Sequence, residues 1–142
     1  MMNKMKSLLK RKSSCVLATT DGNIPHCSLM AYVISTDADK IYLVTSQNTK
    51  KYNNIKYHPG VSLLIDTRGE QKRSHTKALT ITGTCHILED INEISKVRNV
   101  FKQNHPHLQN IIDKGDVAFL CVEFDSLLFL DGPENAHHEI LR

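Results

Sequence analysis

Short apolar segments separated by polar turns run along most of the chain, a pattern typical of an antiparallel sheet. Residues 14–20 predict a strand that ends at the turn signal Asp21-Gly22-Asn23, and residues 25–35 predict the second arm of a hairpin. Four more strands are predicted, at residues 41–45, 61–66, 78–88 and 117–130.

The clearest of these strands is 78–88, because apolar and polar side chains alternate along it. Gly83 lies inside this strand and predicts a bulge or bend, as expected where a sheet closes on itself. His86 falls on the polar face, where we expect it to pack across strands rather than to act in catalysis. Between this strand and the preceding one, residues 66–77 predict a charged loop without an apolar anchor, which is typical of a segment that is either mobile or held by a ligand or partner.

Helical spacing appears in short segments between the strands. Residues 48–57 predict a helix that ends before Pro59, and residues 91–101 and 107–113 predict two more. A basic amphipathic helix is expected at the N-terminus, and a terminal helix is expected after Pro133. In the N-terminal helix, the buried side would consist of Met5, Leu8 and Leu9.

Hairpin-linked strands with short helices between them do not form the alternating pattern of a parallel α/β sheet. They predict a mainly β (α+β) chain, a six-stranded antiparallel barrel with short packed helices, built as one domain over residues 1–142. No internal repeat or linker divides the chain.

Composition and charge narrow the class of protein. An apolar fraction of 40% and a charged fraction of 23% are typical of a globular domain. No apolar run approaches the ~20 residues of a membrane span, and the N-terminal segment lacks the apolar region of a signal peptide, so we expect a cytoplasmic protein. The net charge of +3 arises from five basic side chains in the first twelve residues, which favours a solvated helix face over contact with nucleic acid or a membrane surface.

The four cysteines are dispersed singly among apolar residues, and none forms a CxxC pair. This distribution predicts reduced and mostly buried thiols rather than a disulfide framework. The residues concerned are Cys15, Cys27, Cys85 and Cys121.

The strongest candidate for chemistry lies in residues 44–59, VTSQNTKKYNNIKYHP, where a strand ends and a helix begins. A helix start presents unpaired backbone N–H groups and the positive end of a dipole, and it therefore attracts anions. The hydroxyls of Thr45 and Thr49 and the ammonium groups of Lys50 and Lys51 would complete a phosphate cradle. On this segment alone, a capped surface helix with solvated lysines is an equal alternative.

Other chemistries have less support. The eight histidines include His105, His107, His137 and His138, but neither close pair has the spacing of metal ligands on a helix, so we expect no metal site. His75 could supply a proton near the charged loop, although a solvent-exposed histidine is favoured. No nucleophile elbow, P-loop or GxGxxG motif occurs, which gives no support to a hydrolase, an NTPase or a dinucleotide-binding domain.

Across residues 14–88 the chain resembles the pyridoxamine 5′-phosphate oxidase-like, FMN-binding split β-barrel family. The resemblance rests on CVLATTDG and IPHCSLMAY, on KIYLVT, TKK and HPGVSLLI, and on ALTITGT. Its most specific part is the order strand, Thr45, Thr49-Lys50-Lys51, helix, Pro59, strand. The resemblance implies a six-stranded antiparallel split β-barrel and an FMN phosphate at this segment.

The resemblance also implies a role for each matching position. Thr45 and Thr49 would donate hydrogen bonds to the phosphate, and Lys50 and Lys51 would neutralise it. The strand that contains Ser28, Leu29, Met30 and Ala31 would lie along the flavin ring, with Val44 beside Thr45 and with Lys77 facing the cofactor from the head of the long strand. The family forms homodimers with FMN at the subunit interface, which would suit a half-open barrel with exposed edges.

The chain departs from the family's oxidase at its C-terminal end. It contains no Trp, and residues 129–142 lack the basic and aromatic pattern that holds pyridoxal phosphate, so a true pyridoxamine phosphate oxidase is not expected. The resemblance instead implies an FMN-dependent oxidoreductase that acts on an unidentified small molecule with a reduced nicotinamide or similar donor. The alternatives are a non-catalytic FMN-binding or storage protein, the same barrel binding haem or a deazaflavin, and an interaction module that contacts nucleic acid through its N-terminal helix.

Overall fold

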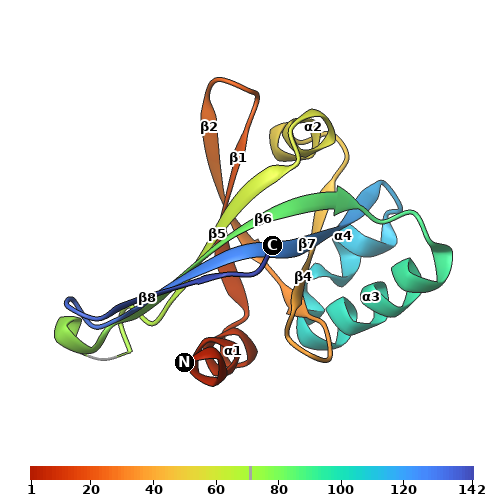
Figure 1. The fold of residues 1–142 in the computed structure, drawn as a ribbon. Coiled ribbons are helices and arrows are strands. Elements are labelled where there is room, and N and C mark those ends of the chain that lie inside the picture. Colours follow the sequence, from red (N-terminus) through yellow and green to blue (C-terminus); the bar gives the residue numbers. More distant parts are fainter. Residues whose placement is uncertain (71) are drawn as a thin grey trace.

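The computed structural model describes residues 1–70 and 72–142 as one curled antiparallel sheet with helices packed around it (Figure 1). The strands are β1 (Ser14–Thr20), β2 (Pro25–Ala31), β3 (Val33–Ile34), β4 (Lys40–Ser46), β5 (Gly60–Asp66), β6 (Lys77–Ile87), β7 (Val117–Asp131) and β8 (Ala136–Ile140). The helices are α1 (Met2–Arg11), α2 (Lys50–Tyr57), α3 (Ile91–Asn104) and α4 (Gln109–Asp113), with 3-10 turns at Arg73–His75 and Pro106–Leu108.

The sheet follows the order β2-β1-β5-β6-β7-β4-β3, and β8 pairs with the second half of β7. β2 and β3 stand at the two ends of this order, yet only Tyr32 separates them along the chain. The chain itself therefore joins the two edges of the sheet and curls it into a split barrel. The mainly β class and the split barrel that the sequence predicts are confirmed.

Tyr32 is fixed at this junction by three hydrogen bonds. Its backbone N–H donates to the Ser13 carbonyl over 3.0 Å, and its hydroxyl donates to the Leu9 carbonyl at the end of α1 over 2.7 Å. Its own carbonyl oxygen lies 2.9 Å from Nε2 of His105, just beyond α3. The residue that closes the barrel thus also anchors the ends of two helices.

Two clusters of buried side chains lie on opposite faces of β7. Ala118, Leu120 and Val122 face the barrel interior, which α1 covers with Met5, Leu8 and Leu9. The alternate residues Val117, Phe119 and Cys121 face α3 and α4 and pack there against Val97, Phe101 and Ile112. Because both faces of this half of β7 are covered, residues 117–122 are all apolar instead of alternating with polar residues.

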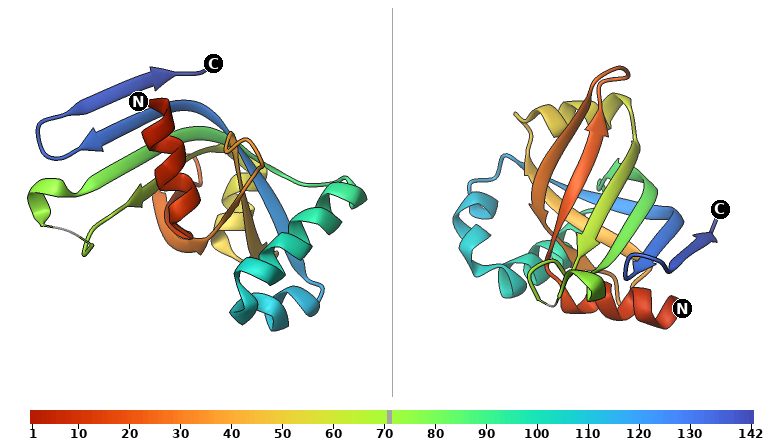
Figure 2. Two further views of the ribbon diagram at one scale, coloured as in Figure 1. Left: turned by 90° about the horizontal axis from the view of Figure 1, so that it is seen from below. Right: turned by 90° about the vertical axis from the view of Figure 1, so that its left-hand side faces the viewer.

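The elements lie around the sheet in a simple arrangement. Figure 1 shows α1 and α2 on different sides of the sheet, while α3 and α4 lie together away from β8. Figure 1 and the left view of Figure 2 show the start of β6 and the β7–β8 hairpin extending together from the body. None of the helices in residues 1–70 and 72–142 is both long and apolar enough to cross a membrane.

Two of the predicted elements differ from the structure. The terminal helix expected after Pro133 is wrong: Gly132, with a positive φ of 79°, begins a turn that returns the chain as β8. The Asp131 N–H donates to the Asn135 carbonyl over 2.8 Å and closes this hairpin. The single arm expected at residues 25–35 is divided at Tyr32 into β2 and β3. The sheet therefore has the six predicted strands, one of them divided, and β8 in addition.

The predicted bulge is present where Gly83 interrupts β6. The register between β6 and β7 shifts between Thr82 and Gly83, and a Cβ atom at Gly83 would lie 2.4 Å from the Glu123 carbonyl oxygen. Only a residue without a side chain allows the two strands to approach this closely. The cysteine prediction is also confirmed in the main: Cys15, Cys85 and Cys121 are buried, and Cys27 on β2 is exposed.

Candidate functional site

The turn between β4 and α2 holds two threonine hydroxyls in contact. Thr45 lies near the end of β4 and is buried, and Thr49 caps α2 by accepting a hydrogen bond from the Tyr52 N–H over 3.3 Å. The two hydroxyl oxygens lie 3.0 Å apart, and each also lies within hydrogen-bond distance of the Ser46 carbonyl, at 3.3 Å from Thr45 and 2.9 Å from Thr49. The hydroxyls of this turn thus already bond to each other and to the backbone.

The start of α2 leaves backbone donors available beside these hydroxyls. The Asn53 N–H donates to the Thr49 carbonyl, and the Tyr52 N–H donates to the Thr49 hydroxyl. Within residues 1–70 and 72–142, no protein acceptor binds the N–H groups of Lys50 and Lys51, as expected at the first positions of a helix. Together with the helix dipole, these donors make the turn attractive to an anion.

A cavity of about 550 Å³ opens at this turn, and we call it the Thr45 pocket. Its volume falls within the range of ligand pockets, roughly 300–1,000 Å³. One wall comes from β2, one from the end of β4 with the start of α2, and one from the segment after α3. Its lining residues are Ser13, Ser14, Leu29, Met30, Ala31, Val44, Thr45, Ser46, Thr49, Lys51, His105, His107, Leu108 and Ile111.

Seven of the residues that the sequence analysis singles out therefore meet in one place. They are Leu29, Met30, Ala31, Val44, Thr45, Thr49 and Lys51. β2 and β4 are not neighbours in the sheet order, so the curl of the sheet, rather than strand pairing, brings these positions together.

Three further candidates lie outside this lining. The Ser28 hydroxyl lies 3.3 Å from Nε2 of His26, and Lys77 lines a groove beside α1 together with Arg11 and Phe129. Lys50 is exposed near the β1–β2 turn. The pKa of Asp21 in that turn is lowered, first by hydrogen bonds from the backbone N–H groups of Ile24 and Asn23 and further by the charges of Lys50 and His58.

Some of the histidines line the Thr45 pocket and others do not. His75 is exposed in the β5–β6 connection, where its Nδ1 lies 3.3 Å from the Ser74 hydroxyl, and it does not line the pocket. His105 and His107 do line it, although the sequence suggested only loop histidines. His105 is buried and bonded to Tyr32, and its ring meets that of His107 edge to face with centroids 5.7 Å apart. Within residues 1–70 and 72–142, no three potential metal ligands cluster.

The outer face of the sheet carries an apolar strip that reaches the pocket. The register places Leu29, Val16, Leu64, Thr80 and Leu128 side by side across five strands. Leu29 is 78% exposed, and Leu128 and Leu130 are 37% and 40% exposed. Because Leu29 belongs both to this strip and to the pocket lining, the pocket opens beside partly exposed apolar side chains of the sheet.

The similarity of this chain to known proteins lies in its match to one family and in its fold. Residues 1–131 match the family model for pyridoxamine 5′-phosphate oxidase. No curated protein matches the sequence.

Several solved structures share the fold at low sequence identity. A heme binding protein from Mycobacterium smegmatis superposes with a TM-score of 0.82 at 16% identity over 95% of this chain, which spans only 56% of that protein. A putative pyridoxamine 5′-phosphate oxidase from Listeria innocua gives a TM-score of 0.73 at 15% identity, covering 92% of this chain and 98% of the other. An FAD-binding protein from Mesorhizobium loti gives 0.75 at 15% identity, covering 91% and 93%.

These structures establish the fold and differ in the ligands that their titles name. The family match, in contrast, covers nearly the whole chain. The protein therefore belongs to the pyridoxamine 5′-phosphate oxidase-like family of split β-barrels.

Proposed function

We propose that the Thr45 pocket binds FMN, with the phosphate at the start of α2. The observation that carries this proposal is the convergence at one cavity of two threonine hydroxyls, the Lys51 side chain, and two backbone N–H groups that bind no acceptor within residues 1–70 and 72–142. In this kind of site, hydroxyls and helix N–H groups donate hydrogen bonds to a phosphate, and an ammonium group neutralises part of its charge.

The donors fit a phosphate after a small change. The Thr45 and Thr49 hydroxyls bond to each other and to Ser46, but a hydroxyl proton rotates freely about its C–O bond. An anion at the helix start would draw these protons towards its oxygens. Thr49 can then donate to the phosphate while it continues to accept from the Tyr52 N–H, so binding leaves the helix cap intact.

The flavin ring would lie along β2. This strand pairs only with β1 in the described sheet, so the backbone groups of its other edge are open to a ligand. Leu29, Met30 and Ala31 form that wall of the pocket, and Leu108 and Ile111 supply apolar contacts opposite. A strand edge beside apolar side chains suits a planar ring that has one polar edge.

We further propose that the protein acts as a homodimer in which the outer face of the sheet is the interface. The apolar strip from Leu29 to Leu128 would be covered by a second copy, and the pocket beside Leu29 would be closed by that copy. Lys77 lies beside α1, on the face of β6 opposite this interface, so the proposal does not assign it to the flavin site.

Bound FMN would supply hydride or electron transfer, and we propose an oxidoreductase that acts on a small molecule. The chain's own residues would hold the phosphate, align the ring on β2 and exclude water through Leu108 and Ile111. A cytoplasmic location is part of the proposal, since the four cysteines are unpaired. The alternative within the same site is a non-catalytic FMN store.

A second candidate ligand is haem, favoured by one specific feature of the pocket. His107 is exposed within the lining, and an imidazole is the commonest protein ligand of haem iron. In this alternative His105 would orient His107 through their edge-to-face contact, while Lys51 would face a propionate.

The deciding experiment is a titration of the purified apo-protein with FMN, a deazaflavin and hemin in parallel, followed by absorption and fluorescence. We expect FMN to bind with quenched fluorescence, and NAD(P)H to bleach the bound flavin under anaerobic conditions. Tight flavin binding without bleaching by any donor would indicate a store. A Soret shift that His107→Ala abolishes, without FMN binding, would replace FMN by haem, and binding of neither would overturn the proposal.

A further inference from the structure

His105 is a buried polar side chain in the lining of the Thr45 pocket. It caps the end of α3 and is 4% exposed, whereas His107 in the same lining is exposed. Burial of a polar ring costs free energy unless its nitrogen atoms find hydrogen-bond partners. The partners of His105 therefore show what this side chain can offer to a ligand.

Three of the four polar groups of His105 are occupied within the protein. Its backbone N–H donates to the Phe101 carbonyl over 2.8 Å, and its carbonyl accepts from the Leu108 N–H over 2.9 Å. Its ring nitrogen Nε2 lies 2.9 Å from the Tyr32 carbonyl oxygen. A carbonyl oxygen can only accept, so Nε2 carries the proton and donates. In the neutral imidazole the other ring nitrogen, Nδ1, is then an acceptor without a proton.

Nδ1 of His105 has no donor among residues 1–70 and 72–142, since the hydrogen bond of this ring goes to Tyr32 through Nε2. In the same part of the chain, every side-chain nitrogen or oxygen that the protein encloses has a partner. An unpartnered Nδ1 must therefore border a space outside the protein, and the cavity that His105 lines is the Thr45 pocket. The pocket thus has an open acceptor atom in the wall that also carries Leu108 and Ile111.

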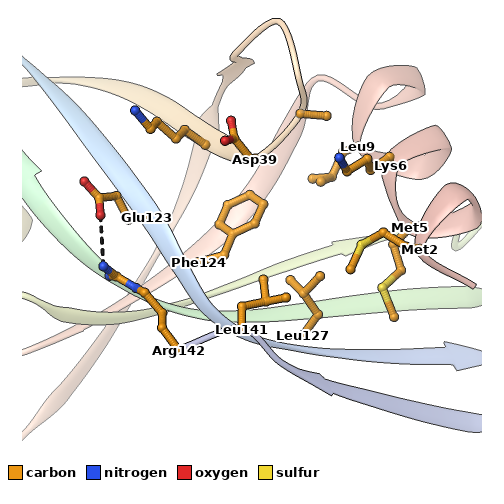
Figure 3. Close-up of a pocket in the computed structure, with 12 residues that line it drawn as sticks. Met2, Met5, Lys6, Leu9, Asp39, Glu123, Phe124, Leu127, Leu141 and Arg142 are labelled. Carbon is orange, nitrogen blue, oxygen red and sulfur yellow. Dashed lines mark hydrogen bonds and ion pairs between the residues drawn. The ribbon is translucent and has the colours of Figure 1, made fainter.

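The ring of His105 is fixed before any ligand binds. Phe101 packs against it, with ring centroids 5.7 Å apart, and its Nε2 bond ends at Tyr32. Tyr32 is itself fixed through its hydroxyl, which donates to the Leu9 carbonyl over 2.7 Å. Figure 3 shows Leu9 on the face of α1 turned towards Phe124, and both side chains belong to the buried cluster inside the barrel. The direction of Nδ1 is therefore set by the packing of the protein.

We propose that Nδ1 of His105 accepts a hydrogen bond from an N–H or O–H group of the bound flavin. This inference rests on the proposal that the Thr45 pocket binds FMN, whose donors are the N3–H of the ring and the hydroxyls of the ribityl chain. Water satisfies such an acceptor in the free protein, so the ligand group that replaces the water must itself donate. His105 thereby selects ligands with a donor at this point, because a methyl group there would leave the acceptor unpaired.

Glutamine and asparagine separate the two roles of the His105 ring. The amide nitrogen of glutamine reaches the position of Nε2, so His105→Gln keeps the bond to Tyr32 and lacks the acceptor. The amide oxygen of asparagine takes the position of Nδ1, so His105→Asn keeps the acceptor and loses the bond to Tyr32. We expect His105→Gln to retain the urea midpoint of the apo-protein and to weaken FMN binding about tenfold. His105→Asn should lower the midpoint and lose less affinity for FMN than His105→Gln.

A control variant and an FMN analogue complete the titrations. His86→Gln makes the same change at an exposed histidine of β6 outside the pocket, and it should alter neither the midpoint nor the affinity. FMN methylated at N3 identifies the donor. If N3–H donates, methylation weakens binding to the parent protein but adds nothing to the loss in His105→Gln. If a ribityl hydroxyl donates, the loss in His105→Gln is the same for both ligands.

NMR of protein labelled with 15N in its histidines tests the two ring nitrogens directly. Their signals differ because only one of them carries a proton, and the His105→Gln variant assigns them. The free protein should show a protonated Nε2 and a bare Nδ1 at His105. Saturation with FMN should shift the Nδ1 signal and leave Nε2 protonated.

The inference is wrong if His105→Gln binds FMN as tightly as the parent protein, or if His105 of the free protein carries its proton on Nδ1. It is also wrong if His105→Asn loses more affinity than His105→Gln, because the bond to Tyr32 would then explain the effect. Hemin binding that His105→Gln abolishes would assign Nδ1 to iron instead. Unchanged FMN binding by His105→Gln overturns this inference and leaves the flavin proposal standing, whereas a parent protein that does not bind FMN overturns both.

Discussion

The hydroxyl oxygens of Thr45 and Thr49 lie 3.0 Å apart, one near the end of β4 and the other at the cap of α2. This contact fixes the angle at which the helix leaves the strand. It also brings both hydroxyls to the lining of the Thr45 pocket, beside the start of α2.

The two adjacent lysines at the start of α2 should contribute unequally to FMN binding. Lys51 lines the Thr45 pocket, whereas Lys50 is exposed towards Asp21. Lys51→Gln should weaken FMN binding by about tenfold or more, because it removes a charge-assisted contact to the phosphate. Lys50→Gln should change it much less. Fluorescence titration of both variants at one salt concentration gives the comparison, and equal losses would contradict the placement.

Thr49 should matter for stability as well as for binding. Thr49→Ala removes the cap of α2 and should lower the free energy of unfolding by about 1 kcal/mol. Thr49→Ser keeps a hydroxyl and should retain most of the stability. Urea denaturation without FMN measures this effect separately from the cofactor. An alanine variant as stable as the parent would show that the hydroxyl does not cap the helix in solution.

The proposed dimer can be tested with two leucine-sized side chains of similar exposure. Leu29 is 78% exposed on the outer face of the sheet, and Ile91 is 80% exposed at the start of α3. Leu29→Glu should convert a dimer to a monomer, because it places a charge in an apolar interface, while Ile91→Glu should leave the dimer intact. Sedimentation velocity distinguishes the two species. Dissociation by both variants, or by neither, would argue against this interface.

The buried thiols predict how stability changes with alkaline pH. Burial raises the pKa of Cys15 and Cys85 to about 12, from 9.0, and that of Cys121 to about 11. The unfolded chain loses these protons at lower pH than the folded chain, so the free energy of unfolding should fall as pH rises from about 9. Cys121→Ala should reduce this fall, and Cys27→Ser, at the exposed cysteine, should not. The fall in the free energy of unfolding is measured from urea denaturation midpoints at roughly one-unit steps between about pH 7 and about pH 10.

Two glycines offer a matched test of the bulge in β6. Gly83→Ala would place a methyl group 2.4 Å from the Glu123 carbonyl oxygen, and it should lower the free energy of unfolding by about 2–3 kcal/mol. At Gly60, where no atom lies within 4 Å of the added Cβ, the same change should be neutral or slightly stabilising. Similar losses in both variants would mean that strand propensity, and not close approach, explains the effect.

Local patterns in the sequence were sufficient to predict most of the sheet. Alternation of apolar residues set β1, β5 and β6 within one residue of their bounds, and Gly83 marked the bulge. The β8 strand was mistaken for a helix because Ala136-His137-His138-Glu139-Ile140 has no strong preference of its own. β8 forms because the turn at Gly132 brings it back beside β7, with which it pairs, and its own residues do not indicate this pairing.

The candidate site was predictable only where its residues are close in sequence. Thr45, Thr49 and Lys51 share one segment, so their convergence could be read from spacing. His105 and His107 enter the same pocket because Phe101 packs on Phe119 of β7, with ring centroids 6.0 Å apart, and this contact holds the last turn of α3 against the sheet. Nothing in the spacing of a histidine pair indicates which wall of a distant cavity it will form.

Tyr32 determines how the Thr45 pocket can change in size. β2 and β4 form two of its walls, and β2 turns into β3, the partner of β4, at this single residue. The split in the barrel is therefore a wedge with its apex at Tyr32, where bonds to Ser13, Leu9 and His105 prevent the walls from separating. A pivot of β2 about this apex would widen the pocket for a larger guest, because Tyr32 is the single residue between β2 and β3. The width of the pocket therefore depends on the angle between β2 and β4 at Tyr32, and two of the residues that hold this hinge, Ser13 and His105, also line the pocket.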